Sequence, residues 1–143
     1  MMDQIQKPLP AVTETTKPYW EAAKRHELLL LRCVDCGHYR HPLAPGESFM
    51  CPNCTSVKQP QWAKASGSGE IATWTVVHKV FHPAFADEAP YVVAIVQLEE
   101  GPRMIANIRG IEPEEIKANM EVEVFFEDLT DEITLPQFRP RGK

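Results

Sequence analysis

The chain has 143 residues, so a small metal-binding module and one compact domain are about the limit of what it can form. Hydrophobic residues make up 43% and charged residues 24%, as in ordinary globular proteins, and no apolar run approaches the length of a membrane span. Residues 1–66 carry a net charge of +2 and residues 67–143 a net charge of -7. The acidic second half repels phosphate backbones, which argues against general nucleic-acid binding.

The first seventeen residues are polar and show no sustained period, so we expect a flexible arm at 1–17. Pro18 suits the first turn of a helix, and residues 19–25 favour a short helix. Two adjacent aromatic residues, Tyr19 and Trp20, need a surface on so short a helix. We favour packing on the protein's own ribbon or barrel, with an anchor for a partner chain as the alternative.

All four cysteines lie close together as two C-x-x-C pairs, namely Cys33, Cys36, Cys51 and Cys54. This is the spacing of two zinc knuckles, which together form a closed tetrahedral sulfur site. A closed site leaves no position open for water, so the sequence predicts a structural zinc ion and no catalytic metal. A single iron ion of the rubredoxin type would fit the same four ligands.

Other uses of the cysteines are less favoured. Disulfides need an oxidising compartment, but the opening Met-Met-Asp-Gln has no basic start, apolar core or cleavage site, so we expect a cytoplasmic protein. A thioredoxin-like pair should open a helix, whereas Gly37 follows the first pair and Pro52 lies inside the second. Since four thiolates already fill the site, His38 and His41 are expected around the site or on the surface.

Short apolar and turn-forming segments indicate a ribbon around the cysteines. Residues 28–31 read as a strand that enters the first knuckle, and residues 41–47 contain two prolines and a glycine, as in a turn between ribbon strands. The Ser- and Gly-rich residues 65–69 mark a module boundary. We therefore expect a helix and zinc ribbon at 18–66 and a second domain at 67–143.

The second domain has a β pattern throughout. Five strands are predicted around residues 71–80, 91–98, 103–109, 121–126 and 133–135, with a helical turn at 110–116 and a tail at 136–140. Five strands with a small helix between the third and fourth give the element order of an OB-fold barrel. The predicted fold class is thus mainly β, a five-stranded OB-fold barrel preceded by a short helix and a rubredoxin-like zinc ribbon.

A series of short segments resembles one known family. They are Pro18-Tyr19-Trp20, Leu31-Arg32-Cys33, Cys36-Gly37, Cys51-Pro52, Gly69-x-Ile71, Thr75-Val76-Val77-His78, Pro90-Tyr91, Val124-Phe125-Phe126-Glu127-Asp128 and Leu135-Pro136-x-Phe138-Arg139-Pro140. From about residue 17 to residue 141 the chain is similar to the acyl-CoA-associated OB-fold proteins with a rubredoxin-like zinc ribbon, the family called domain of unknown function thirty-five.

The resemblance implies an accessory subunit. Members of the family associate with thiolase-like enzymes that act on acyl-CoA thioesters, including thiolases and the lipid-transfer-protein-like aldolases of steroid side-chain degradation, and others are joined to an enoyl-CoA hydratase. We therefore expect a non-catalytic scaffold in acyl-CoA, lipid or steroid metabolism, with contact to acyl-CoA as a further expectation. A single-stranded nucleic-acid binder is the alternative, since OB folds and zinc ribbons both occur in that role.

The search for catalytic groups agrees with a non-enzyme. The cysteines are assigned to metal, no serine sits in a G-x-S-x-G elbow, and there is no P-loop or dinucleotide pattern. His78 could act as a general base with Asp87 or Glu88, in a stand-alone thioesterase or hydratase. A histidine at a strand end more often simply makes hydrogen bonds, so this hypothesis is the weakest of the three.

Two surfaces are candidates for contact with a partner enzyme or acyl-CoA. The first is the loop bracketed by an aromatic and imidazole cluster, formed by His78, His82, Phe85 and Tyr91. The second is the tail, where Phe138 is followed by Arg139, whose guanidinium suits a phosphate or carboxylate. The alternatives without a binding role are that the loop simply packs on the barrel and that the arginine near the terminus is solvated.

Overall fold

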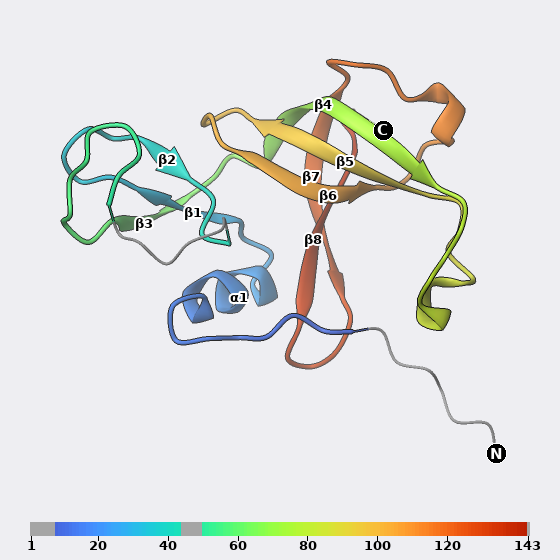
Figure 1. Ribbon diagram of the computed structural model, residues 1–143, viewed down its shortest axis with the longest axis horizontal. Coiled ribbons are helices and arrows are strands. Elements are labelled where there is room, and N and C mark those ends of the chain that lie inside the picture. The colour runs from blue at the N-terminus through green and yellow to red at the C-terminus, as the bar shows by residue number, and fades with distance from the viewer. Residues whose placement is uncertain (1–7, 44–49, 143) are drawn as a thin grey trace.

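The computed structural model describes residues 8–43 and 50–142, which form a small ribbon, a helix and a barrel (Figure 1). The helix α1 (Lys17–Lys24) begins with Pro18 in its first turn, where the missing N–H costs nothing. Its buried face consists of Tyr19, Trp20, Ala22 and Ala23. No helix within the described part of the chain is long and apolar enough to cross a membrane.

The ribbon is a three-stranded antiparallel sheet in the order β2-β1-β3. It consists of β1 (Leu29–Arg32), β2 (Tyr39–Arg40) and β3 (Gln61–Lys64). The strand predicted at 28–31 is confirmed as β1, whereas β3 was not foreseen because Gln61 and Lys64 give it little strand character. The turn predicted at 41–47 lies mostly outside the described residues.

The barrel is closed, with strand order β4-β5-β6-β8-β7. Its strands are β4 (Ser68–Val77), β5 (Tyr91–Leu98), β6 (Arg103–Ile108), β7 (Glu121–Asp128) and β8 (Thr134–Pro140), with short 3₁₀ turns η1 (Pro83–Phe85) and η2 (Pro113–Glu115). Only β6 and β8 run parallel. This is the OB-fold arrangement, so the predicted fold class is confirmed.

The end of the Ser- and Gly-rich segment, Ser68 and Gly69, is part of the barrel strand β4. Gly69 pairs with Leu98 on one side and with Val122 on the other. A Cβ added at Gly69 would lie 2.8 Å from both the Gln97 carbonyl oxygen and the Val96 side chain, so the glycine permits a close approach of the strands. The strand therefore begins earlier than the predicted residue 71.

The prediction of a tail at 136–140 is wrong, because these residues form most of β8. The strand pairs with β7 along its whole length, from Thr134 opposite Asp128 to Pro140 opposite Val122. Phe138 at its centre has no exposed surface. The strand was underestimated because its two prolines, Pro136 and Pro140, usually argue against a strand.

One continuous cluster of buried side chains joins the helix and ribbon to the barrel. It runs from Tyr19, Trp20 and Leu30 into the barrel residues, including Ile71 and Phe138. The helix α1 contacts both β1 and β8, and in Figure 1 it lies below the ribbon and beside β8. The division into separate modules at 18–66 and 67–143 stays a prediction. A test must show whether each part stays folded when the core that they share is disrupted.

Candidate functional site

The four cysteine sulfurs converge at the tip of the ribbon. All lie within 4.8 Å of one another, with 3.7 Å between Cys33 and Cys54 and 3.6 Å between Cys36 and Cys51. Zinc binds thiolates at about 2.3 Å in a tetrahedron, whose edges are then about 3.8 Å long. The donor set and spacing therefore fit one tetrahedral zinc ion.

Each C-x-x-C pair is held by the same kind of turn. The Gly37 N–H donates to the Cys33 carbonyl at 3.0 Å, and the Thr55 N–H donates to the Cys51 carbonyl at 2.9 Å. Gly37 and Thr55 both have positive φ, 79° and 64°, which closes each turn. The two turns bring the thiols of each pair to one side, as a four-sulfur site requires.

The electrostatics of the sulfurs also call for a cation. Hydrogen bonds from the Asn53 side chain and the His38 backbone lower the pKa of Cys36 to about 6. The Ser56 backbone lowers the pKa of Cys54, but burial and the neighbouring thiols outweigh it and raise that pKa to about 12. Four thiolates at this distance repel one another unless a metal cation lies among them.

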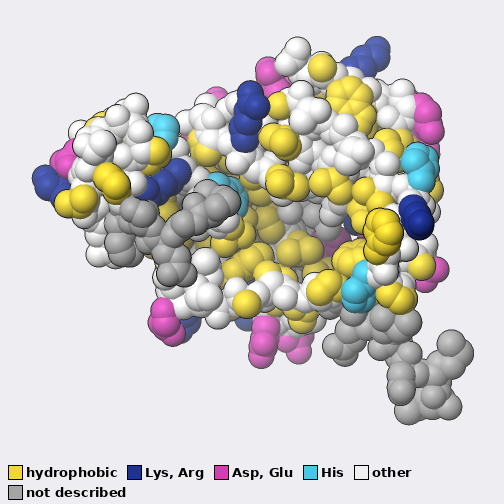
Figure 2. Space-filling view, viewed as in Figure 1, with side chains coloured by type: hydrophobic (Ala, Val, Ile, Leu, Met, Phe, Trp, Pro, Cys, Tyr) yellow, Lys and Arg dark blue, Asp and Glu magenta, His cyan; other side chains and the backbone are white. Residues whose placement is uncertain are grey.

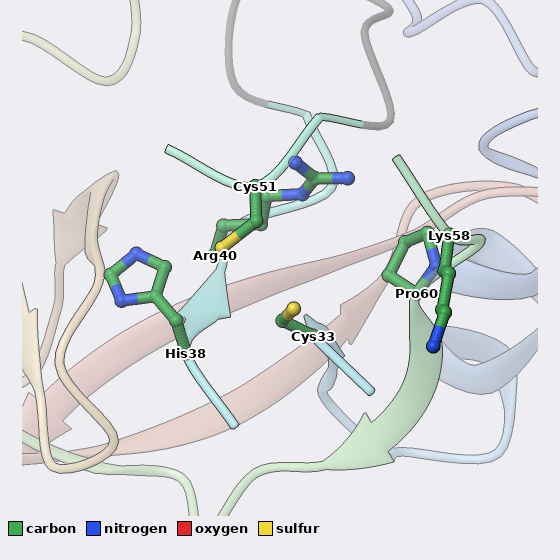
Figure 3. A pocket seen from close by; sticks show the side chains of 6 residues that line it. All are labelled: Cys33, His38, Arg40, Cys51, Lys58 and Pro60. Carbon is green, nitrogen blue, oxygen red and sulfur yellow. The ribbon is translucent and has the colours of Figure 1, made fainter. Parts of the chain in front are cut away.

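The space beside the sulfurs is too small for a substrate. A cavity of about 10 Å³ is lined by Cys33, His38, Arg40, Cys51, Lys58 and Pro60, and Figure 3 shows the Cys33 and Cys51 sulfurs directed toward it. This volume suits a single ion or water. His38 thus lies beside the sulfurs, as expected. Of the two basic residues in this lining, Lys58 pairs with Asp35 at 3.0 Å and Arg40 donates to the Met50 carbonyl at 2.9 Å.

His41 has a different place from His38. Its Nε2 lies 3.4 Å from the Tyr19 hydroxyl, and its ring meets the Tyr19 ring at a centroid distance of 5.3 Å. Burial lowers the pKa of His41 to about 4, and burial raises the pKa of Tyr19. His41 is therefore neutral at pH 7 and belongs to the contact between ribbon and helix.

A groove crosses the molecule where α1, the ribbon, β6 and β8 meet. It has a volume of about 350 Å³ and is mainly apolar, with the lining Tyr19, Trp20, His41, Leu43, Arg103, Met104, Ile105, Leu135 and Pro136. Figure 2 shows a hollow floored by hydrophobic side chains in this part of the molecule. We call this lining the β6–β8 groove. An exposed apolar surface of this kind is typical of an interaction site.

A smaller cavity adjoins the groove at the loop between β4 and β5. It measures about 70 Å³, shares Leu135 with the β6–β8 groove, and also contacts Phe85, Tyr91 and Arg109. The Arg109 guanidinium lies 3.0 Å from the Glu88 carboxylate, so this positive charge is already paired. The loop therefore lines a second cavity, which meets the β6–β8 groove at Leu135.

The loop cluster predicted from the sequence forms in part. The His82 and Phe85 rings are 5.7 Å apart, and the Phe85 and Tyr91 rings are 6.3 Å apart. His78 is exposed and, within the described residues, bonds to neither Asp87 nor Glu88. The constellation for a base-catalysed reaction is thus not assembled in this part of the chain.

The other predicted contact residues are buried or engaged elsewhere, although Tyr19 and Trp20 also line the β6–β8 groove. Tyr19 and Trp20 are 2% and 6% exposed and belong to the core, which confirms the favoured interpretation that they pack on the protein's own fold. Phe138 is fully buried and leaves no surface for a partner. Arg139 donates to Glu123 at 3.2 Å and lies over the Phe125 ring, on the far side of β8 from the core.

The groove residues on β6 were missed by sequence reasoning. Met104 and Ile108 are buried inside the barrel, so the alternation of the strand places Ile105 outside, where it is 72% exposed. An apolar residue at an outward position was the available signal. Leu135 was assigned to a strand, but its place in the groove depends on how β6 and β8 diverge.

Comparisons with known proteins agree with this architecture. A family model for the rubredoxin-like zinc ribbon domain of ChsH2 matches residues 20–45, and a model for the C-terminal OB-fold domain of ChsH2 matches residues 62–127. The chain is 34% identical over 121 residues to a DUF35 domain-containing scaffold protein of Methanothermobacter thermautotrophicus, covering 85% of this chain and 87% of that protein.

Another relative is a longer protein than this chain. The chain is 40% identical over 136 residues to a probable enoyl-CoA hydratase alpha subunit of Thermomonospora curvata, covering 94% of this chain but 40% of that protein. The chain thus spans less than half the length of this relative.

Two solved structures are similar. The structure described as the Ltp2-ChsH2(DUF35) aldolase contains a chain with 40% identity and a TM-score of 0.79, covering 92% of this chain and 98% of that chain. A DUF35 protein from Sulfolobus solfataricus has 11% identity and a TM-score of 0.60, covering 89% and 85%, and shares the fold. With its zinc ribbon, its OB-fold barrel and these relatives, the chain belongs to the DUF35 family of ChsH2-type proteins.

Proposed function

We propose that the chain is a non-catalytic accessory subunit that binds a thiolase-like enzyme, either a thiolase or a lipid-transfer-protein-like aldolase, in acyl-CoA, lipid or steroid side-chain metabolism. The observation that carries the proposal is the likeness to the chain of the Ltp2-ChsH2(DUF35) aldolase, which extends over 98% of that chain at 40% identity. The relatives named scaffold proteins support the same role. An enoyl-CoA hydratase is a second partner class, suggested by the relatives with that name.

In this proposal the zinc is structural. We assign Cys33, Cys36, Cys51 and Cys54 as its ligands, because their sulfurs fit one tetrahedral ion and leave no position open for a substrate. When bound, the metal supplies positive charge that holds four thiolates together and fixes the two turns. The protein residues supply the binding surfaces, with His82, Phe85 and Tyr91 as candidates for contact with the partner or its acyl-CoA.

The proposal can be tested by isolating the tagged chain from its native cells at moderate ionic strength. We expect a thiolase-like chain to co-purify at stoichiometric yield, and its activity to need the complex. The absence of any such chain would overturn the proposal.

The isolated chain offers a second test against the enzyme hypothesis. We expect no turnover of acyl-CoA thioesters by the purified protein, and no change in the activity of the complex on His78→Ala. Turnover by the isolated chain that His78→Ala abolishes would establish an enzyme and refute the accessory role.

A further inference from the structure

The strand β6 has one paired edge and one open edge. Toward β5 it pairs along its whole length, from Arg103 opposite Gln97 to Ile108 opposite Val92. Toward β8 it pairs only at Ile108, opposite Phe138. In a barrel, both edges of a strand are normally used, so the first part of β6 is an exception.

The ladder fixes which backbone groups face the open edge. The Leu98 N–H donates to the Pro102 carbonyl at 2.9 Å, and in an antiparallel pair such hydrogen-bonded positions alternate. Met104 and Ala106 therefore bond to β5, whereas Arg103 and Ile105 direct their N–H and C=O groups away from it. Among the described residues, the β6–β8 ladder has the single partner pair Ile108 and Phe138, so no ladder pair reaches Arg103 or Ile105 on that side.

Proline explains why β8 does not close this gap. The Arg109 N–H donates to the Phe138 carbonyl at 2.8 Å, so Phe138 and, two residues earlier, Pro136 face β6. Pro136 has no N–H to donate, so the parallel ladder cannot continue past it. The two strands then diverge, and the β6–β8 groove lies between them.

The groove itself is built to be covered. Its rim carries Ile105 and Leu43, which are 72% and 42% exposed, so apolar surface remains in contact with water. Trp20, which lines it, is 6% exposed, and its indole N–H is buried without an acceptor among the described residues. Trp20 therefore belongs to the floor of the groove, and an occupant with carbonyl groups could instead accept from the outward N–H groups of Arg103 and Ile105.

We propose that an extended segment of the partner enzyme adds to the open edge of β6 as a further strand, with alternate side chains in the β6–β8 groove. This inference rests on the proposed function and names the surface through which the chain would bind the partner enzyme. Arg103 and Ile105 present donor and acceptor pairs two residues apart, a spacing of about 7 Å that an extended backbone matches and a small molecule does not. The apolar rim would be covered by the same segment.

A proline substitution tests the backbone contact separately from the side chain. Ile105→Pro removes the outward N–H and leaves the ladder to β5 intact, since that residue makes no bond to β5. We expect it to weaken binding of the co-purified thiolase-like chain, expressed and titrated in calorimetry, by at least about tenfold. The control Ile105→Val keeps the N–H and the branched shape and should bind within about twofold of the unaltered protein.

Amide hydrogen exchange followed by NMR gives a second readout. It uses the unaltered protein, so it does not depend on whether a variant folds. In the free chain the Arg103 and Ile105 amides should exchange fast, while the Met104 and Ala106 amides are protected by β5. In the complex all four should be protected. A complex that leaves the Arg103 and Ile105 amides fast, or that binds Ile105→Pro as tightly as the unaltered chain, overturns the inference and leaves the accessory role intact.

Other occupants give distinct results, and each would overturn the inference. If the two amides are protected in the free chain and lose protection when residues 1–7 are deleted, the chain's own first residues fill the groove. If acyl-CoA alone protects them, the occupant is a ligand. If they become protected as the free chain is concentrated and dimerises, it is a second copy. If no thiolase-like chain binds at all, the proposed function itself fails.

Discussion

Phe138 and Arg139 are neighbours on β8. Replacing each by alanine tests whether this segment is a strand of the barrel or a tail on its surface. Phe138 has 0% exposed surface and lies in the core. Truncation of a buried Phe to Ala removes its transfer free energy and leaves a cavity, at a cost of about 3–5 kcal/mol. The backbone bond from Arg109 to the Phe138 carbonyl is kept in the variant, so the loss reports the side chain alone.

Arg139 is the matched control on the other face of the strand. Its side chain is 49% exposed and pairs with Glu123, which is 36% exposed, so screening by water limits this ion pair to about 1 kcal/mol or less. Its contact with the Phe125 ring, 5.5 Å from guanidinium to ring centre, is also at the surface and adds about 0.5–1 kcal/mol. Arg139→Ala should therefore lower the free energy of unfolding by under about 2 kcal/mol.

The two variants can be compared by urea unfolding in the presence of zinc, followed by circular dichroism. With a slope of about 1–3 kcal/mol per molar urea, Phe138→Ala should move the midpoint by at least about 1 M, and at the same slope Arg139→Ala should move it by less than about two thirds as much. Equal, small shifts for both variants would refute the assignment of residues 136–140 to the core of the barrel. They would restore the interpretation of this segment as a tail.

Three further outcomes are expected. Metal analysis in reducing buffer should find about one zinc ion per chain, and Cys51→Ser should unfold the ribbon while the barrel strands stay folded by NMR; loss of both together would mean one cooperative unit. Burial lowers the pKa of His41 from 6.5 to about 4, so between these pH values the folded state binds fewer protons than the unfolded state. The free energy of unfolding should therefore fall by up to about 3 kcal/mol as the pH drops from about 6.5 to about 4. His41→Gln should remove this part of the pH dependence of the urea midpoint, and an unchanged profile would contradict the assignment. Gly69→Ala places a Cβ 2.8 Å from the Gln97 carbonyl and should cost about 1–3 kcal/mol in thermal unfolding, against little for the control Ser68→Ala.

Local sequence signals predicted the parts of the fold that depend on local chemistry. The cysteine spacing alone placed two turns and a four-sulfur site, because each pair closes within four residues. The strands at 91–98 and 103–109 were found because β-branched residues alternate between turn signals, and they match β5 and β6 nearly to the residue. Phe138, whose burial depends on strand pairing, was instead placed on the surface.

The prolines of β8 show why the rest could not be predicted. Pro136 and Pro140 are tolerated because both face away from β7, so neither position needs an N–H for that ladder. Which side of a strand a proline faces depends on its register with a neighbour, and register is not visible in a single segment. The same register creates the gap beside β6, so the groove could not have been located before the pairing was known.

The zinc site and the groove are linked by the chain between them, although the metal has no open position for chemistry. The ribbon supplies His41 and Leu43 to the wall of the β6–β8 groove, and His41 meets Tyr19 on the helix that contacts β8. A ribbon that lost its metal would no longer hold this wall, because so small a sheet has little core of its own. If the proposed function holds, zinc therefore acts on partner binding by keeping this wall of the groove in place. It follows that chelation should weaken binding even of a partner that never contacts the cysteines.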